Sequence, residues 1–285
     1  MKCFYHNDLD GKCSAALVYN EMKNKFSREV ELCPVNYGEA FPWGSIGDGE
    51  DVWMVDFSLQ PFSDMIKLSN VAKLTWIDHH KTAIEAYTQS KTTIRGIQRN
   101  GIGACQLVFD YIHPNIAVPD AVRLLAEYDV WNHKDPRCLP FQYGMRLRDL
   151  SPEDNRWAII FAAPADSAAI TDTVATGDTI LNFIKQDNRV RAGAACFDLN
   201  FEGLHFLAAN QGPCNSQLFD SLIKPEHDAV LAFYWARDKW RVSMYTSKEG
   251  VDVSPIAKKY GGGGHAGAAG FQCTELPFPL TPKVV

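Results

Sequence analysis

The chain has 285 residues, of which 46% are hydrophobic and 22% are charged, so it is long enough to bury a substantial core in one or two domains. Its formal net charge of −6 argues against the broad basic surface with which proteins grip long nucleic acids. We therefore expect no stable binding of long DNA, and a nucleic-acid ligand would have to be short or held locally.

The amino terminus lacks the apolar stretch of a secretion signal, and no run approaches the roughly 20 apolar residues of a membrane-spanning helix. The eight cysteines are scattered, without a pair at the close spacing of a metal site. Scattered cysteines in a chain without a secretion signal indicate reduced thiols. The sequence therefore predicts a cytoplasmic protein that does not associate with membranes, and it leaves the oligomeric state unknown.

In the first 130 residues, short apolar runs alternate with helical patterns. We predict strands at 2–6, 30–35, 51–57 and 73–78. Helices are expected in the run after Gly11, at 62–69, from residue 104 and at about 120–128. Strands that alternate with helices predict a parallel sheet with helices on both faces.

After residue 150 the pattern changes. Prolines and small residues in 151–176 indicate a linker region, and a helix with Ile180, Phe183 and Ile184 on one face follows. Paired strands are predicted at 197–200 and 205–210, and a hairpin joins 229–235 to 240–245. The last helix is expected to have Ser254 as N-cap, Pro255 at its first position and Gly261 after its last turn.

These patterns predict an α/β fold with two domains. The first, at 1–165, has the parallel sheet with helices on both faces. A linker with a connecting helix covers 166–192, and a smaller α/β domain with a mixed sheet covers 193–285.

Aspartate and histidine side chains gather where the predicted parallel strands end. The set consists of His6, Asp8 and Asp10 after the first strand, Asp56 in the third, and Asp78, His79 and His80 at the fourth. Alternate residues of an extended segment point the same way, and Gly11 would let the chain turn into the helix. Because ligands bind beyond the carboxyl ends of parallel strands, we expect these side chains to meet at one edge of the sheet.

A further carboxylate, Asp129, continues the apolar helix face of Val122 and Leu125. A buried carboxylate needs a cation or a strong donor, and Arg123 is an alternative partner. Each residue of the set alone would more often be a turn or capping residue. Together, several aspartates at one sheet edge would repel one another unless a multivalent cation held them. Oxygen ligands mixed with imidazole favour Mn²⁺, with Mg²⁺ or Co²⁺ as alternatives.

A run of four glycines, Gly261–Gly264, precedes His265 near the carboxyl terminus. Such a run lets backbone N–H groups approach a phosphate closely, and the histidine adds a donor. We therefore predict that Gly262, Gly263, Gly264 and His265 bind substrate; a flexible turn after the preceding helix is the structural alternative.

These segments resemble the motifs of the DHH phosphoesterase superfamily. The segment 6–11 resembles the first motif, Asp56 the second, Asp78-His79-His80 the third and Asp129 the fourth. The segment 261–270 resembles the glycine-rich signature of the DHH-associated C-terminal domain, which accompanies RecJ-like nucleases and the nanoRNase branch. The short gap between His6 and Asp8 is RecJ-like, whereas the nanoRNase branch usually has a longer one.

The resemblance implies a DHH catalytic domain at 1–165 and a substrate-binding domain at 193–285, which together hydrolyse phosphate esters with two divalent ions. It implies that one ion is bound by His6 and Asp8 and the other by Asp10, His79 and Asp129, with Asp56 as the bridge. His80 and Asp78 would be the catalytic residues, because the resemblance makes His80 face the scissile phosphate and Asp78 orient the histidines.

The acidic charge and the lack of room for further domains favour a short oligonucleotide or a small nucleotide as substrate, hydrolysed in the manner of an exonuclease or oligoribonuclease. One alternative is an inorganic pyrophosphatase or exopolyphosphatase, although such pyrophosphatases carry a different second domain. The second alternative is a nucleotide-sensing module without catalysis. Against it, all six metal ligands and His80 are present.

Overall fold

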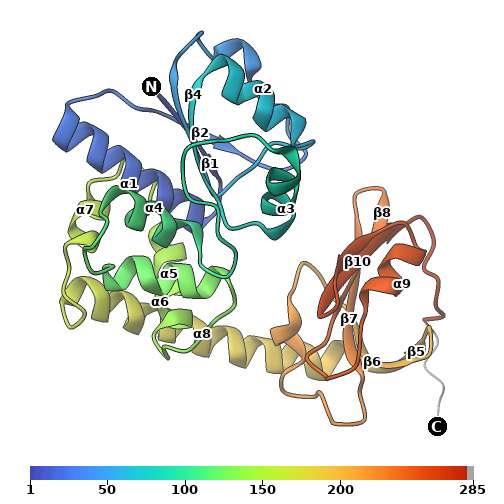
Figure 1. Ribbon diagram of the computed structural model, residues 1–285. Coiled ribbons are helices and arrows are strands. Elements are labelled where there is room, and N and C mark those ends of the chain that lie inside the picture. Colours follow the sequence, from blue (N-terminus) through green and yellow to red (C-terminus); the bar gives the residue numbers. More distant parts are fainter. Residues whose placement is uncertain (281–285) are drawn as a thin grey trace. The chain divides into compact units, whose positions relative to one another are not determined.

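The computed structural model describes residues 1–280, which form two compact units (Figure 1). The first unit ends at Leu181 and the second begins at Asn182. This boundary falls within helix α8 (Ala168–Ala195), inside the segment predicted as a linker with a connecting helix. The predicted limits of the two functional domains remain a prediction.

A four-stranded parallel sheet forms the centre of the first unit, in the order β2-β1-β3-β4. The strands are β1 (Lys2–His6), β2 (Glu31–Val35), β3 (Asp51–Val55) and β4 (Lys73–Ile77). The register pairs His6 with Val35 and Val55 with Ile77, so the four carboxyl ends lie along one edge. This pairing confirms the predicted parallel sheet. Parallel strands need long crossover connections, and helices between short apolar strands provide them.

Helices cover both faces of this sheet (Figure 1). Tyr5 and Trp53 point into one apolar cluster, whereas their neighbours Phe4 and Met54 point into the other, as the two-residue period of a strand requires. The first cluster also includes residues of α1 (Leu9–Phe26), α4 (Ala104–Ile112), α5 (Asp120–Asp129), α6 (Cys138–Arg148) and α7 (Arg156–Phe161). The second includes residues of α2 (Ser63–Val71) and α3 (Lys81–Ser90).

The second unit contains a mixed sheet in the order β5-β6-β7-β8-β10-β9, which confirms the predicted fold class. Only β6 and β7 run parallel to each other. Helix α9 (Ser254–Lys259) packs on one face, and the end of α8 with the short helix η2 (Ser216–Phe219) packs on the other. The strands are β5 (Cys196–Phe201), β6 (Leu204–Asn210), β7 (Ala229–Ala236), β8 (Lys239–Tyr245), β9 (Gly263–His265) and β10 (Ala268–Cys273).

Two local predictions were wrong. The segment 151–176 is not simply a linker, because it contains α7 and the first turns of α8. The N-cap of α9 is Val253 and not Ser254, which is the first helical residue. The carboxylate of Asp252 instead accepts the N–H of Ser254 at 2.8 Å, so the capping oxygen comes from further upstream. Within residues 1–280, no helix is long and apolar enough to cross a membrane.

Candidate metal centre

The link between β1 and α1 determines where the first predicted ligands lie. Helix α1 begins at Leu9, and Asp8 is its N-cap, whose Oδ1 accepts the Gly11 N–H at 2.9 Å. The predictions of an extended Asp10 and of a turn at Gly11 were therefore wrong, because both residues are already helical. A Cβ at Gly11 would lie 2.0 Å from the carbonyl oxygen of His6, so glycine is required for close packing and not for a turn.

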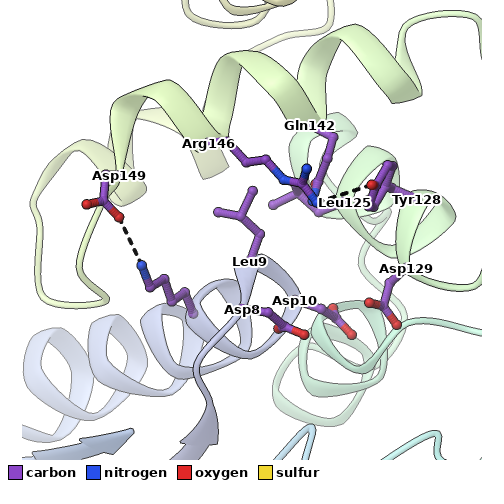
Figure 2. A pocket seen from close by; sticks show the side chains of 10 residues that line it. Asp8, Leu9, Asp10, Leu125, Tyr128, Asp129, Gln142, Arg146 and Asp149 are labelled. Carbon is purple, nitrogen blue, oxygen red and sulfur yellow. Dashed lines mark hydrogen bonds and ion pairs between the residues drawn. The ribbon is translucent and has the colours of Figure 1, made fainter. Parts of the chain in front are cut away.

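Asp10 is buried and held by the amino-terminal end of α4. Its Oδ2 accepts the N–H of Ala104 at 2.6 Å, and its Oδ1 accepts the N–H of Cys105 at 2.8 Å. The free N–H groups and the dipole of a helix start stabilise a carboxylate in this position. Figure 2 shows the carboxylates of Asp8, Asp10 and Asp129 along one side of the same pocket.

Asp56 follows β3 directly and is 1% exposed. Its Oδ2 lies 3.7 Å from Nδ1 of His6, and its Oδ1 lies 3.1 Å from Nε2 of His79. One carboxylate thus faces two imidazoles with different oxygens, as a bridging ligand would. Its φ of 55° is uncommon for a residue with a side chain, and such backbone strain persists only where the surrounding structure imposes it.

His79 connects Asp56 to the carboxylate at the end of α5. Its Nε2 lies 3.1 Å from Oδ2 of Asp129 and 3.9 Å from Oδ2 of Asp10. Arg123, the alternative partner considered for Asp129, instead forms ion pairs with Asp120, Glu127 and Asp135. The alternative was therefore wrong, and His79 is the side chain that contacts Asp129 at ion-pair distance.

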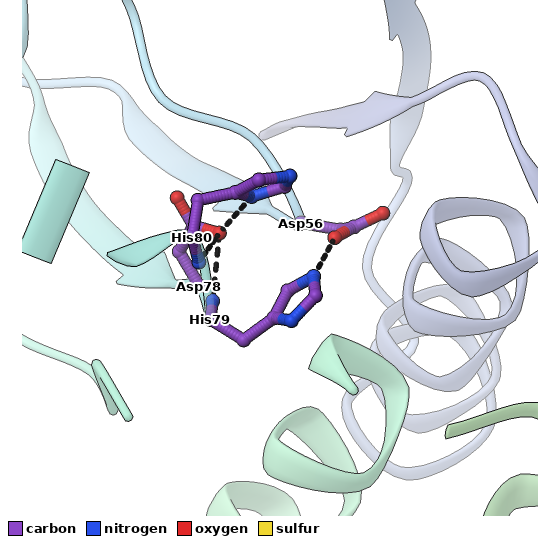
Figure 3. Close-up of side chains that lie close together, drawn as sticks. All are labelled: Asp56, Asp78, His79 and His80. Carbon is purple, nitrogen blue, oxygen red and sulfur yellow. Dashed lines mark hydrogen bonds and ion pairs between the residues drawn. The ribbon is translucent and has the colours of Figure 1, made fainter. Parts of the chain in front are cut away.

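Asp78 is fully buried and fixes the segment after β4 (Figure 3). Its Oδ1 accepts the backbone N–H groups of His79 at 2.7 Å and of His80 at 3.1 Å. The same oxygen lies 2.6 Å from Nδ1 of His80. Since a carboxylate only accepts, Nδ1 carries the hydrogen and the Nε2 of His80 is left for another partner.

The carboxylates and imidazoles shift one another's pKa values. Burial raises the pKa of Asp56 to about 6 and places that of Asp10 well above its usual range. Contacts with Asp56 and Asp8 raise the pKa of His6 to about 10. Burial alone would lower the pKa of His79, but its contacts with Asp129 and Asp56 raise it to about 11. Without a cation, the cluster therefore retains protons that a metal would displace.

Two buried atoms at the centre of the cluster, Nδ1 of His6 and Oδ2 of Asp56, make no hydrogen bond with the residues described. Nδ1 of His6 lies 2.8 Å from Oδ2 of Asp8, but not in the orientation of a hydrogen bond. Buried polar atoms without a partner are costly, and a cation between them would satisfy both.

Among the described residues, four groups of ligand atoms have metal-site spacing, with all atoms of each group within 4.8 Å of one another. One of them consists of Asp56, Asp78, His79 and His80. Two others make up the candidate pair of sites. They are His6, Asp8 and Asp56, and Asp10, His79 and Asp129. With the contact between His79 and Asp56, these residues fit two divalent cations that share the Asp56 carboxylate.

The glycine-rich segment of the second unit lies at the edge of its sheet. Gly262 lines a hollow of about 500 Å³, whereas Gly263, Gly264 and His265 form the exposed strand β9. This strand pairs with β10 in antiparallel register. The same hollow is lined by the cationic side chains Lys239 and Arg241, which the sequence analysis did not single out.

Residues 213–279, which include this segment, match the model of the DHHA1 domain. The second unit thus contains a DHHA1 domain. The segments that resemble the DHH motifs lie in the first unit, which this match does not cover.

Known proteins resemble this chain at low sequence identity. An uncharacterized protein of Acanthamoeba polyphaga mimivirus is 22% identical over 243 residues, which are 80% of this chain and 55% of that protein. The chain thus spans about half the length of the curated relative that it matches.

Solved structures share the fold at lower identity. The DHH domain of a protein from a ribosomal-protein family has a TM-score of 0.61 and 13% identity, covering 94% of this chain and 81% of the other. PggH, a pGpG-specific phosphodiesterase from Vibrio cholerae, has a TM-score of 0.53 and 14% sequence identity, covering 95% of this chain and 92% of the other. An exopolyphosphatase-related protein from Bacteroides fragilis has a TM-score of 0.53 and 13% sequence identity, covering 96% of this chain and 87% of the other.

The remaining group of side chains with metal-like spacing lies in the second unit, at Asp198, His205 and His227. Here the hydrogen bonds indicate a histidine that donates to a carboxylate and not one that binds a cation. Nδ1 of His227 accepts the backbone N–H of Lys224 at 2.9 Å, so the hydrogen of the neutral ring is on Nε2. This Nε2 lies 2.9 Å from Oδ1 of Asp198 and offers it a hydrogen, not a lone pair to a cation.

Tyr37 is a residue near the DHH motifs that the sequence analysis missed. Its ring centroid lies 5.8 Å from that of His6 and 6.0 Å from that of His80. It also packs against Phe57, with 4.5 Å between ring centroids. Tyr37 follows the carboxyl end of β2. The rule that ligands bind beyond the carboxyl ends of parallel strands would therefore have indicated Tyr37 as well.

Proposed function

We propose that this chain is a two-metal phosphoesterase that hydrolyses phosphodiester or phosphomonoester bonds of short oligonucleotides or small nucleotides. The proposal is carried by one observation. The buried Asp56 carboxylate presents one oxygen to His6 and the other to His79, within two groups of oxygen and imidazole ligands. Four carboxylates and two imidazoles in one cluster suit hard or borderline divalent cations, and we propose Mn²⁺, with Mg²⁺ or Co²⁺ as alternatives.

When bound, two such ions would lower the pKa of an attacking water and neutralise charge on the phosphate oxygens. The chain's own residues hold and orient the ligands. Asp10 is fixed by backbone N–H groups of α4, and Asp78 fixes the backbone on both sides of His79. Burial alone would lower the pKa of His80, but contact with Asp78 raises it and so favours the protonated form, in which both ring nitrogens carry hydrogens. We propose that this form of His80 donates a hydrogen bond or a proton from Nε2 to the substrate phosphate or leaving oxygen.

Replacing His80 with Ala is expected to lower kcat by about 100- to 10,000-fold, the range typical of a lost general acid. Metal content should be unchanged, because His80 is not assigned to either ion. Metal analysis and steady-state kinetics on the same preparation check both expectations. A variant that keeps its metal and a near-normal kcat would exclude the proposed role of His80.

For the substrate, the acidic charge of −6 and the likeness to PggH support a small nucleotide. The fold does not separate this proposal from polyphosphate hydrolysis, because the exopolyphosphatase-related protein has the same TM-score of 0.53. Inorganic pyrophosphatase or exopolyphosphatase activity is therefore the alternative. The hollow with Lys239, Arg241 and Gly262 would suit the phosphate of either substrate class.

A substrate panel with Mn²⁺ separates these proposals. It should contain short RNA, short DNA, linear and cyclic dinucleotides, 3′-phosphoadenosine-5′-phosphate, pyrophosphate and tripolyphosphate. We expect turnover of a short oligonucleotide, dinucleotide or bisphosphate. Faster phosphate release from pyrophosphate or tripolyphosphate would support the alternative, and tight nucleotide binding without turnover would support a sensing module. We also propose a cytoplasmic location, since all eight cysteines are free thiols.

A further inference from the structure

A pocket of about 310 Å³ lies beside the candidate metal centre, between α1, α5 and α6 (Figure 2). Asp8, Asp10 and Asp129 line one side of this pocket. Arg146 and Gln142 of α6 line it as well, and the resemblance to the DHH family assigned a role to neither. The pocket lies wholly within the first unit.

Arg146 is held in place by aromatic rings. Its guanidinium lies 5.4 Å from the ring centroid of Tyr128 and 5.2 Å from that of Tyr143. Its Nη2 donates to the Tyr128 hydroxyl at 3.2 Å. In the described part of the chain Arg146 has no carboxylate within ion-pair distance, whereas Arg123 and Arg137 on neighbouring elements are both paired with aspartates. A guanidinium has five N–H donors, so most of those of Arg146 remain available to a ligand.

Gln142 lies one turn before Arg146 on the same helix. It is 5% exposed, and its Oε1 is buried without a hydrogen-bond partner among the residues described. A buried acceptor without a partner is costly, and hydrogen bonding to a ligand in the pocket would remove that cost. The amide can accept through its oxygen or donate through its nitrogen, so it suits a hydroxyl group beside a phosphate.

Lys12 of α1 also lines the pocket and adds positive charge. Its Nζ lies 3.0 Å from Oδ1 of Asp149, whose side chain is 83% exposed. An ion pair with so exposed a carboxylate contributes little, so Lys12 can exchange Asp149 for an anionic ligand at small cost.

The charge balance around the pocket depends on the cations. Without them, the carboxylates of Asp8, Asp10, Asp56 and Asp129 would repel an anion. Two divalent cations carry four positive charges, which formally balance these four carboxylates. The guanidinium of Arg146 is then an uncompensated positive charge on the pocket wall, and guanidinium groups bind phosphate through two parallel hydrogen bonds.

We propose that Arg146 and Gln142 form a subsite for a second phosphate of the substrate, distinct from the phosphate that is hydrolysed, and for the hydroxyl beside it. The subsite rests on the proposed phosphoesterase function and narrows its substrate class to nucleotides with at least two phosphates. Arg146 binds the second phosphate, Gln142 the adjoining hydroxyl, and Lys12 strengthens the positive potential.

The test compares a dinucleotide without a terminal phosphate with its 5′-phosphorylated and 3′-phosphorylated forms, in Mn²⁺. For the wild type, we expect KM for one phosphorylated form to be roughly 10- to 100-fold lower than for the unphosphorylated dinucleotide, because the unphosphorylated form lacks one charge-assisted contact. Arg146→Met should remove this preference, so that KM for the phosphorylated forms rises to that for the unphosphorylated dinucleotide. Arg148→Met, in the same last turn of α6 but outside the pocket, should keep the preference.

Metal content and Tm of each variant show whether it is folded and loaded. If Arg146→Met lowers Tm, Arg146→Lys decides, because it keeps the charge but loses the planar fork and should keep only part of the preference. A wild type without any preference, or a preference that survives in Arg146→Met, would overturn the subsite. If the wild type hydrolyses none of the three dinucleotides, the proposed function fails instead, and binding of the same dinucleotides to wild type and Arg146→Met then decides the subsite.

Discussion

Replacing Asp56 with Asn is expected to lower kcat/KM by about 100- to 1000-fold, as for the loss of one preorganised electrostatic group, and to reduce metal content from two ions to one or none. The reason is the position of its two oxygens, 3.7 Å from His6 and 3.1 Å from His79. An asparagine keeps one carbonyl oxygen but presents an NH₂ group, a donor, where the second oxygen would bind a cation. Metal analysis and kinetics on purified protein measure both effects.

The matched control is Asp166→Asn, which removes a charge of the same kind from an exposed position outside the cluster. This control should keep both the metal and the activity. In the absence of metal, Asp56→Asn should lower Tm little, because burial already disfavours the charged form of Asp56. Two ions per chain and near-normal turnover in Asp56→Asn would rule out the bridging role.

Saturating Mn²⁺ is expected to raise Tm by on the order of 10 °C. A ligand at 1,000 times its Kd stabilises a protein by about 4 kcal/mol, and 1 kcal/mol shifts Tm by about 2–4 °C in a domain of this size. The effect should be large here because the cation also relieves repulsion among buried carboxylates.

The stabilisation by metal should also increase with pH. In the metal-free chain the pKa of Asp56 is raised to about 6, so protonation of Asp56 stabilises the folded state. This stabilisation is fully present below the unfolded pKa of 3.8 and is lost as pH rises through about 6. The raised pKa values of His6 and His79 act in the same direction. Their contribution is present below 6.5 and is lost as pH rises through about 10 and 11. The metal-free protein therefore becomes less stable with rising pH, while metal binding becomes stronger because fewer protons must be displaced.

Thermal unfolding with Mn²⁺ and with chelator, at about pH 5.5 and about pH 8, measures this difference. We expect the gain in Tm to be larger at the higher pH. Adding Mg²⁺ and Ca²⁺ in parallel separates binding at this site from a general effect of divalent ions. A gain in Tm that is equal at both pH values, or larger at the lower one, would contradict the proton-linked account.

The sheet and its acidic edge could be predicted from sequence because both depend on short-range patterns. Apolar runs such as Lys73–Ile77 end in Asp78, and the carboxyl ends of parallel strands share an edge. Asp10 was misassigned because the capping side chain of Asp8 starts α1 earlier than Gly11 suggested. Here a local hydrogen bond decided between a helical and an extended backbone.

The pocket around Arg146 could not be predicted. Arg146 contacts Tyr128 of α5 only because α6 packs against α5. Nothing within the segment Cys138–Arg148 indicates this contact. Tertiary packing of this kind has no sequence period, so a basic side chain such as Arg146 cannot be told from an ordinary solvated one before the structure is known.

Anomalous diffraction from Mn²⁺-loaded crystals tests the central claim most directly. The account predicts two peaks about 3.5–4 Å apart, the usual separation in two-metal sites, with the carboxylate of Asp56 between them. One peak should contact His6 and Asp8, and the other Asp10, His79 and Asp129. A single peak, or peaks that leave Asp56 without a metal contact, would contradict it.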